Sequence, residues 1–346
     1  MHRGENSDSI PNDLIPEILS RLPAKSIARF RCLSKLWKSI ICRQDFTELF
    51  NTRSSSNPRL LIGVEQDGVW SFFSSPQPQN HYEKSSLVVA ADFHMKSSED
   101  RIPHYCSYAS GLIYFTDLQI SKDGFDNVIC NPSTGQFAIL PPDLTTYRNF
   151  GGLLGYDPIG RQFKVLVHNR RVNDELVYHI LTLGTENVKW REIKFPLFSD
   201  LSSEMICING VLYYITLGVS KMEDDYDGGF PLKLRMWVLE DVEKEEWTTY
   251  SYTVKAENLI KDNDYINVVG ATALGKIVLA KKNACKPFYV FYFNPEKNTL
   301  LSVEIQGVGK EEEWCDHHSV YYFVDHVEDI NFDVMKKTYA ATSISP

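Results

Sequence analysis

Residues 10–50 read IPNDLIPEILSRLPAKSIARFRCLSKLWKSIICRQDFTELF, and their apolar spacing decides the fold of the amino-terminal part of the chain. The first apolar residues lie on one face of a helix, at Leu14, Ile15, Ile18, Leu19 and Leu22. A second apolar stripe runs from Ile27 to Ile41, and Ser34 can end one helix and cap the next. We therefore expect a small all-α unit of three helices, with an extension over residues 46–50.

This helical unit is too small to bury all of its apolar side chains within itself. About forty residues make at best a marginal hydrophobic core. Part of the apolar surface should therefore lie against another protein or against the rest of this chain. The helical spacing alone leaves both possibilities open, because an apolar helical face is usually core.

The charge of the chain excludes some classes of partner. The protein has 36 basic and 45 acidic side chains, a formal net charge of −9, so its overall field repels nucleic acids and anionic lipid surfaces. The charge is uneven, since residues 1–57 contain nine Lys and Arg against six Asp and Glu. We expect two modules, and neither a nucleic-acid partner nor a membrane partner.

Several features bear on the compartment. No apolar run approaches the roughly 18 residues needed to cross a bilayer, and the amino end MHRGENSDSIPND lacks the apolar core of a signal peptide. The seven cysteines are widely scattered and odd in number, unlike a disulfide framework. The sequence favours a cytoplasmic or nuclear location.

Beyond residue 58 the sequence changes to short alternating strands separated by Gly, Asn-Pro and Asp-Gly turns. Three kinds of short sequence phrase recur there. Strands that begin with Gly lie at 111–114, 210–214 and 275–279, and turns lie at 130–135, 156–160 and 293–297. A Trp in a charged strand end occurs at 189–192 and 245–248. Successive copies lie roughly 40 to 60 residues apart, the period of four-stranded propeller blades.

The second module is therefore expected to be an all-β, β-propeller-like domain over residues 58–340, with five or six blades. A pair of β-sandwiches is the alternative architecture. Strands at residues 59–62 and 319–323 can pair to close the ring. The polar stretch 51–57 is expected to be the linker between this domain and the helical unit at 10–50.

Residues 10–50 resemble the F-box of plant F-box proteins. The resemblance is carried, in order along the chain, by Ile10-Pro11, Asp13-Leu14, Glu17-Ile18-Leu19, Leu22-Pro23, Lys25-Ser26, Arg29-Phe30-Arg31-Cys32, Ser34-Lys35 and Trp37. The chain departs from the family pattern at residues 43–45, because a Pro often follows the third helix in the family.

This resemblance implies docking on the Skp-family adaptor of an SCF ubiquitin ligase, and through the adaptor on a cullin–RING ligase. By position, the adaptor-binding residues that it implies are Pro11, Leu14, Ile18, Leu22, Ile27, Cys32 and Trp37. Such recognition buries apolar anchors within a polar rim. The positive excess of residues 1–57 would speed the encounter with an acidic partner surface.

The β-rich module resembles the F-box-associated, kelch-like interaction domain of many plant proteins. The phrases that carry this resemblance are CNPSTGQFAILPP, LLGYDPIGRQFKVL, KWREI, CINGVLYYIT and FYFNPEKNTLLSVEI. The resemblance covers nearly all of residues 58–330. It implies a domain that recruits a substrate and performs no catalysis.

Catalytic, metal and cofactor sites are not expected. The chain has no hydrolase, zinc-protease or P-loop motif. Residues 223–228 imitate the start of a calcium loop, but Leu234 occupies the position of the required Glu ligand. In the segment 314–318, adjacent His residues on one strand would point to opposite faces, which disfavours zinc binding.

The sequence thus predicts the non-catalytic substrate-recognition subunit of an SCF-type E3 ubiquitin ligase, with an unidentified protein target. The alternative is a ligand-binding or enzymatic β-propeller whose amino-terminal helices are purely structural. Candidate target-binding loops contain aromatic and charged residues and lie at 147–149, 168–171 and 221–229.

Overall fold

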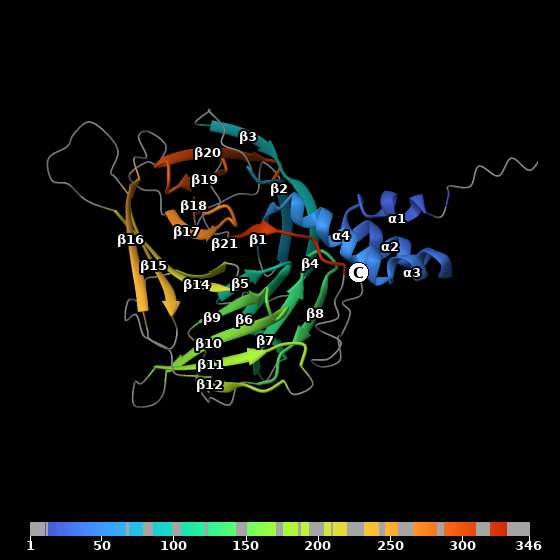
Figure 1. The fold of residues 1–346 in the computed structure, drawn as a ribbon, viewed down its shortest axis with the longest axis horizontal. Coiled ribbons are helices and arrows are strands. Elements are labelled where there is room, and N and C mark those ends of the chain that lie inside the picture. Colours follow the sequence, from blue (N-terminus) through green and yellow to red (C-terminus); the bar gives the residue numbers. More distant parts are fainter. Residues whose placement is uncertain are drawn as a thin grey trace, which may run out of the picture.

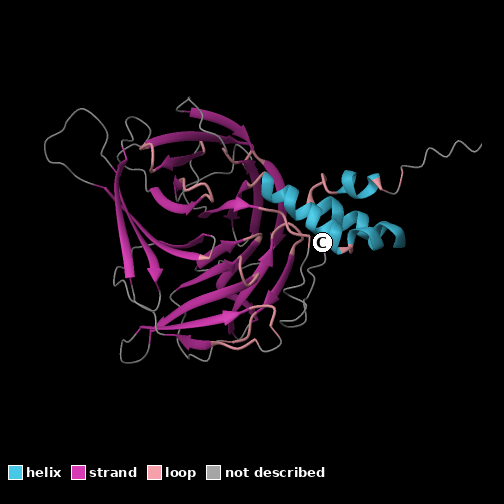
Figure 2. Cartoon of the chain, in the orientation of Figure 1, coloured by secondary structure: helices cyan, strands magenta, loops and turns pink. Residues whose placement is uncertain are grey.

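The chain forms a small helical unit attached to a ring of β-sheets (Figures 1 and 2). The computed structural model describes residues 11, 13–66, 69–78, 86–98, 105–121, 124–142, 151–170, 176–185, 188–193, 204–208, 210–219, 232–241, 246–254, 266–281, 287–308 and 319–330. No described helix is long and apolar enough to cross a membrane. The small all-α unit followed by a β-propeller agrees with the fold class expected from the sequence.

Four helices make up the amino-terminal unit: α1 (Leu14–Leu19), α2 (Ala24–Leu33), α3 (Lys35–Ile41) and α4 (Gln44–Ser56). Ser34 separates α2 from α3 as predicted, because its side chain caps α3 by accepting a 3.2 Å hydrogen bond from the backbone N–H of Trp37. The expected extension is α4, whose Phe46 and Phe50 are buried with Ile27 in one core.

The expected linker at residues 51–57 is not a separate loop. Residues 51–56 complete α4, and β1 begins at Arg59, so only two residues lie between helix and strand. Asn and Ser disfavour a helix interior only weakly, and tertiary packing overrides that preference. Here Arg53 of α4 pairs with Glu17 of α1, and this contact holds the polar half of α4 on the helical unit.

Five four-stranded units surround the centre of the second domain, and we number these blades I to V. Blade I contains β21 (Ser319–His326), β1 (Arg59–Gln66), β2 (Val69–Pro76) and β4 (Asp92–Ser98). Blade II contains β5 (Tyr105–Ala109), β6 (Leu112–Ser121), β7 (Gly124–Asn131) and β8 (Gln136–Ile139). Blade III contains β9 (Gly151–Asp157), β10 (Gln162–Arg170), β11 (Leu176–Thr182) and β12 (Arg191–Ile193).

The last two blades complete the ring. Blade IV contains β13 (Glu204–Ile208), β14 (Val211–Val219), β15 (Leu232–Asp241) and β16 (Glu246–Val254). Blade V contains β17 (Ile266–Ala271), β18 (Ile277–Lys281), β19 (Tyr289–Asn294) and β20 (Thr299–Gln306). A further strand from the blade I segment, β3 (Ser86–Ala90), pairs in parallel with β20 at the edge of blade V. The five blades agree with the expected five or six.

The predicted ring closure is confirmed. β1 pairs with β21 in an antiparallel register that places Leu61 opposite Phe323 and Ile62 opposite Tyr322. Blade I is therefore built from both ends of the domain. The inner strands β5, β9, β13, β17 and β21 contact one another in turn around the centre.

The Gly-initiated phrases occupy equivalent places in three blades. The turn phrases do not, because Asn131 and Asn294 lie between the third and fourth strands of blades II and V, and Asp157 lies between the first and second strands of blade III. In three turns a side-chain oxygen accepts the backbone N–H groups two and three residues further on, at Asn131, Asp157 and Asn294. The Gly-initiated phrases begin at Gly111, Gly210 and Gly275, whose φ angles of 91°, 81° and 76° fit the tight turn before the second strand of each blade.

Apolar clusters pack neighbouring blades together at four of the five junctions in the described part of the chain. The cluster between blades V and I contains, among others, Leu60, Val278 and Tyr322. The other three clusters join blades I and II, II and III, and IV and V. These contacts make the ring a rigid platform with a shared central space.

Candidate functional site

Two features stand out on the described residues, and the first is a set of exposed apolar side chains on the helical unit. Leu14 and Ile18 lie one turn apart on α1 and are each 47% exposed. Leu33 at the end of α2 and Leu36 at the start of α3 are 69% and 54% exposed. Four large aliphatic side chains in water on so small a unit are typical of a protein-binding surface.

The structure sorts the residues predicted to bind the adaptor into three groups. Pro11, Leu14, Ile18 and Cys32 are exposed. Leu22 and Trp37 are half-buried against the helical core, and the ring of Trp37 lies 5.3 Å from that of Phe30 between centroids. These six residues remain available, wholly or in part, to a partner.

Ile27 is the correction to that prediction. Its side chain is 1% exposed and packs in the core with Leu19, Phe46 and Phe50. α2 turns this position inward because the face that carries Ala24 and Ile27 is the one that contacts the neighbouring helices. Ile27 therefore holds the unit together and has no free surface to offer.

Leu33 and Leu36 belong to the second apolar stripe predicted from the sequence, which left open whether the stripe is core or binding surface. They are the most exposed large aliphatic residues described in the unit. They flank Ser34, where the chain leaves α2 in an extended conformation with φ −156° and ψ 161°. This break rotates the flanking residues away from the common core. Two leucines on either side of a helix-breaking Ser are the signal that could have found them.

The helical unit is fastened to the propeller by the segment that follows β21. Glu328 accepts a 2.8 Å hydrogen bond from the backbone N–H of Ala24 in α2, and its own N–H donates to Ser54 Oγ of α4 at 2.7 Å. Ile330 packs against the helical core. In Figure 1, α4 lies nearest the strands and α1 to α3 lie farther out, so the exposed leucines are carried away from the ring.

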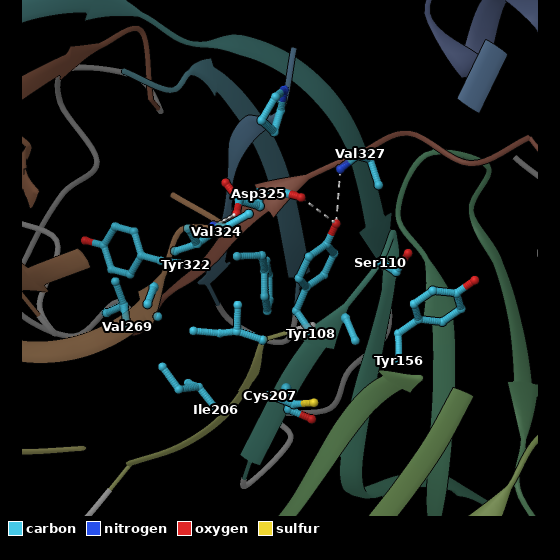
Figure 3. Close-up of a pocket in the computed structure, with 18 of the residues that line it drawn as sticks. Tyr108, Ser110, Tyr156, Ile206, Cys207, Val269, Tyr322, Val324, Asp325 and Val327 are labelled. Carbon is cyan, nitrogen blue, oxygen red and sulfur yellow. Dashed lines mark hydrogen bonds between the residues drawn. The ribbon is translucent and has the colours of Figure 1, made fainter. Parts of the chain in front are cut away.

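The second feature is the central space of the propeller, a cavity of about 640 Å³. All five inner strands contribute side chains, and these converge in Figure 3, where Tyr108, Ile206, Val269 and Tyr322 surround the opening. Ser55, Ser56 and Pro58, at the junction of α4 and β1, also line the cavity. One end of the central space therefore opens beside the helical unit.

Polar groups in the cavity wall are largely paired within the protein. Tyr108 Oη accepts hydrogen bonds from the backbone N–H groups of Gly111 and Val327, at 2.8 Å and 3.1 Å, and burial raises the pKa of this phenol. Asp325 accepts hydrogen bonds from the Gln77 side chain and from the Ala273 backbone, while burial raises its pKa.

The cavity also contains thiols. Cys106 and Cys207 line it from β5 and β13 and are half-buried. Burial raises the pKa of Cys207, so this thiol stays protonated at neutral pH. The wall is therefore mainly apolar and uncharged.

The other predicted sites fall mostly outside the described residues. This holds for 147–149, residue 171, the acidic stretch 221–229 and the Cys/His stretch 314–318. His168 is half-buried, with its ring centroid 6.1 Å from that of Tyr178. Within the described ranges, no three His, Cys, Asp or Glu side chains come together as metal ligands.

Comparison with known proteins assigns each of the two modules to a protein family. Residues 7–49 match the model of the F-box domain, and residues 59–226 and 216–327 match the model of the F-box associated beta propeller domain. A putative F-box protein of Arabidopsis thaliana is 59% identical, with 100% of this chain and 93% of the relative covered. A second Arabidopsis thaliana F-box protein is 54% identical over 97% of this chain and 82% of the relative.

Proposed function

The chain belongs to the F-box proteins that carry an F-box associated β-propeller domain, and from this we propose that it is the substrate receptor of an SCF-type ubiquitin ligase. The F-box docks on the Skp-family adaptor and through it on the cullin–RING ligase. The propeller holds a protein target for ubiquitination. The chain itself supplies proximity, since tethering raises the effective concentration of the target near the transferring enzyme.

The observation that carries this proposal is the exposure of four large aliphatic side chains on the F-box. Leu14, Ile18, Leu33 and Leu36 supply apolar anchors, and Pro11, Cys32 and Trp37 adjoin them in the sequence. Lys25, Arg29, Arg31, Lys35 and Lys38 are all exposed on the same two helices, α2 and α3. Exposed apolar anchors accompanied by basic side chains on the same helical unit fit an acidic adaptor surface, which is steered into place by charge and held by burial.

The attachment of the F-box to the propeller supports the same role. Both Ala24 of α2 and Ser54 of α4 are bonded to Glu328, so the helices cannot turn freely on the propeller. A receptor with this rigidity holds its target at a fixed place relative to the ligase. The chain acts in the cytoplasm or nucleus in this proposal, and it binds no nucleic acid, membrane or cofactor.

Adaptor binding by the full-length chain tests the proposal. The double variant Leu14→Ala/Leu36→Ala should weaken binding to the purified Skp-family adaptor by at least about tenfold, because truncating interface anchors costs more than about 1 kcal/mol. Its melting temperature should stay close to that of the unmodified chain, because both side chains are about half exposed.

Ile159→Ala is the matched control, since Ile159 is an exposed aliphatic residue on the propeller. This control should bind the adaptor normally. Unchanged adaptor binding by the double variant would contradict the proposal and favour the alternative, in which the helices are purely structural and the propeller binds a ligand or acts as an enzyme. Isothermal titration calorimetry measures both affinities.

A further inference from the structure

Large apolar side chains are exposed at one end of the central cavity. Outside the helices, the exposed large hydrophobic residues in the described part of the chain are Val88, Ile159, Val211, Tyr250 and Leu274. Three of these, Ile159, Val211 and Leu274, lie at the turns between the first and second strands of blades III, IV and V. Neighbouring blades thus carry the same unusual feature at equivalent places.

Neither Ile159 nor Leu274 is required by the turn that carries it. The side chain of Asp157 holds the first turn by accepting the N–H groups of Ile159 and Gly160, both at 3.0 Å. Ile159 is 95% exposed and Leu274 is 63% exposed, so neither stabilises the fold by burial. Polar residues normally occupy such tips, and exposed apolar groups that gather together mark interaction sites.

The three turns form one rim. An added Cβ at Gly210 would lie 3.2 Å from Pro158 Cδ, so the turn before Val211 packs directly on the turn that carries Ile159. Pro158 and Leu274 both line the central cavity. We call Pro158, Ile159, Val211 and Leu274 the rim patch. The turn that carries Leu274 also contacts the end of β21, because the N–H of Ala273 donates a hydrogen bond to Asp325. Val327 and the junction of α4 and β1 line the same cavity.

The chemistry of the cavity defines what it can hold. Asp325 is the one lining residue, of those described, with an acidic or basic side chain, and its oxygens already accept hydrogen bonds from Gln77 and Ala273. Ser107 Oγ accepts the N–H of Leu154 at 2.7 Å. The wall offers mainly apolar surface, and its acidic group is already hydrogen-bonded within the protein, so a charged group placed there would lose hydration with little compensation.

The rim patch and the cavity wall are therefore both mainly apolar, and they adjoin each other through Pro158 and Leu274. We propose that together they bind an uncharged, apolar segment of the target polypeptide, with bulky side chains inserted into the cavity and the backbone lying across the rim patch. This rests on the proposed function and names the kind of target segment. About 640 Å³ lies within the roughly 300–1,000 Å³ range of ligand sites, enough for several side chains.

The position of this site suits its task. Ser55, Ser56 and Pro58 line the same cavity, so the bound segment would lie beside the end of α4 and next to the F-box attachment. Among its described residues the wall contains a single acidic side chain, Asp325, and no basic one, whereas the whole chain has a net charge of −9. Selection against charged segments, by the cost of burying a charge, would supply specificity.

A peptide selection tests the proposal without a known target. Random dodecapeptides displayed on phage are selected on the immobilised full-length chain and, in parallel, on the variant Ile159→Lys/Leu274→Lys. Both substituted side chains are exposed, so the variant should melt with the unmodified chain. Peptides enriched on the unmodified chain should be rich in Leu, Phe, Ile and Trp and poor in charged residues, and they should bind the variant at least tenfold more weakly.

The cavity thiols report where the enriched peptides bind. Such a peptide should slow alkylation of Cys106 and Cys207 by N-ethylmaleimide several-fold, while Cys32 and Cys42, exposed on the F-box, should react unchanged. Tyr250→Lys, which changes an exposed apolar residue on β16 away from the rim patch, is the control and should retain binding.

Several results would overturn the proposal. The selection could fail to enrich any peptide, or it could enrich basic or acidic peptides. The enriched peptides could bind the Ile159→Lys/Leu274→Lys variant as tightly as the unmodified chain. Finally, the cavity thiols could become protected as the protein concentration rises, with no peptide present. The last result would mean that a second copy of the chain covers the rim patch. Adaptor binding, measured on the same samples, is independent of these outcomes, so a failure here is distinguishable from a failure of the ligase proposal.

Discussion

The carboxylate of Glu328 accepts a hydrogen bond from the backbone N–H of Ala24 at 2.8 Å, although 304 residues separate them along the chain. Ala24 is the first residue of α2, and the preceding Pro23 provides no side-chain cap. A helix begins with unpaired N–H groups, and a negative charge near them is favourable. The last part of the described chain thus completes a helix of the F-box.

The first prediction concerns this remote cap. Glu328→Ala should lower the free energy of unfolding by about 1–2 kcal/mol, the usual cost of removing a helix cap. Urea unfolding followed by circular dichroism at the helical band measures the change. Glu296→Ala, at an exposed turn of blade V, is the control and should change stability by less than about 0.5 kcal/mol. Equal effects from the two variants would refute the capping role.

The second prediction concerns pH. Burial raises the pKa of Glu328, against the smaller opposing effects of the hydrogen bond from Ala24 and the charge of Arg59. The stability from such a group is fully present below its unfolded pKa of about 4.3 and is lost as the pH rises through the folded pKa. Glu328→Gln removes the titration, so its stability relative to the unmodified chain should rise over the pH range that begins at about 4.3 and extends upward through the raised folded pKa. A difference that stays constant across this range would contradict the assignment.

The third prediction separates two turns that look alike in sequence. Asn294 caps its turn by accepting two backbone N–H groups, at 3.0 Å and 3.2 Å. Asn131 does the same and also donates from Nδ2 to the carbonyl oxygen of Asp329, at 3.0 Å. Asn131→Ala should therefore cost about 1 kcal/mol more than Asn294→Ala, the typical worth of one further hydrogen bond.

Aspartate variants check the same assignment. Asn294→Asp keeps the accepting oxygen and should be nearly neutral, whereas Asn131→Asp loses the donor to Asp329 and should destabilise. Chemical denaturation ranks all four variants. Indistinguishable aspartate variants would mean that the contact with Asp329 contributes nothing.

The fourth prediction concerns the packing of blades II and III. A Cβ added at Gly152 would lie 2.5 Å from Cε1 of Tyr114, a side chain with no exposed surface. Gly152→Ala should cost about 1–3 kcal/mol through overpacking. Tyr114→Leu should make room for the added methyl group, so the double variant should lose less stability than the sum of the two single losses. Additive losses, measured by thermal unfolding, would show that the two residues do not meet.

Much of this architecture could be predicted from the sequence because it is decided over short distances along the chain. The apolar spacing in residues 14–22 and the cap at Ser34 determine helices locally. The turns at Asn131, Asp157 and Asn294 are stabilised by side chains that bond to their own neighbours. Repetition of these phrases at a blade-like period indicated a propeller, and the pairing of residues 59–62 with the last strand followed from closing a ring.

The candidate binding surfaces depended on contacts that no local pattern contains. Ile27 and Leu33 lie in the same predicted stripe, yet one is 1% exposed and the other 69% exposed, because burial depends on which elements pack against each face. The parallel pairing of β3 with β20 and the capping of Ala24 by Glu328 join residues more than two hundred positions apart. The sequence by itself determined the helices, the turns and the repeat, since these rest on neighbouring residues. Only the tertiary structure decided which apolar side chains remain exposed and where they meet, because that depends on the packing of segments that are distant in the chain.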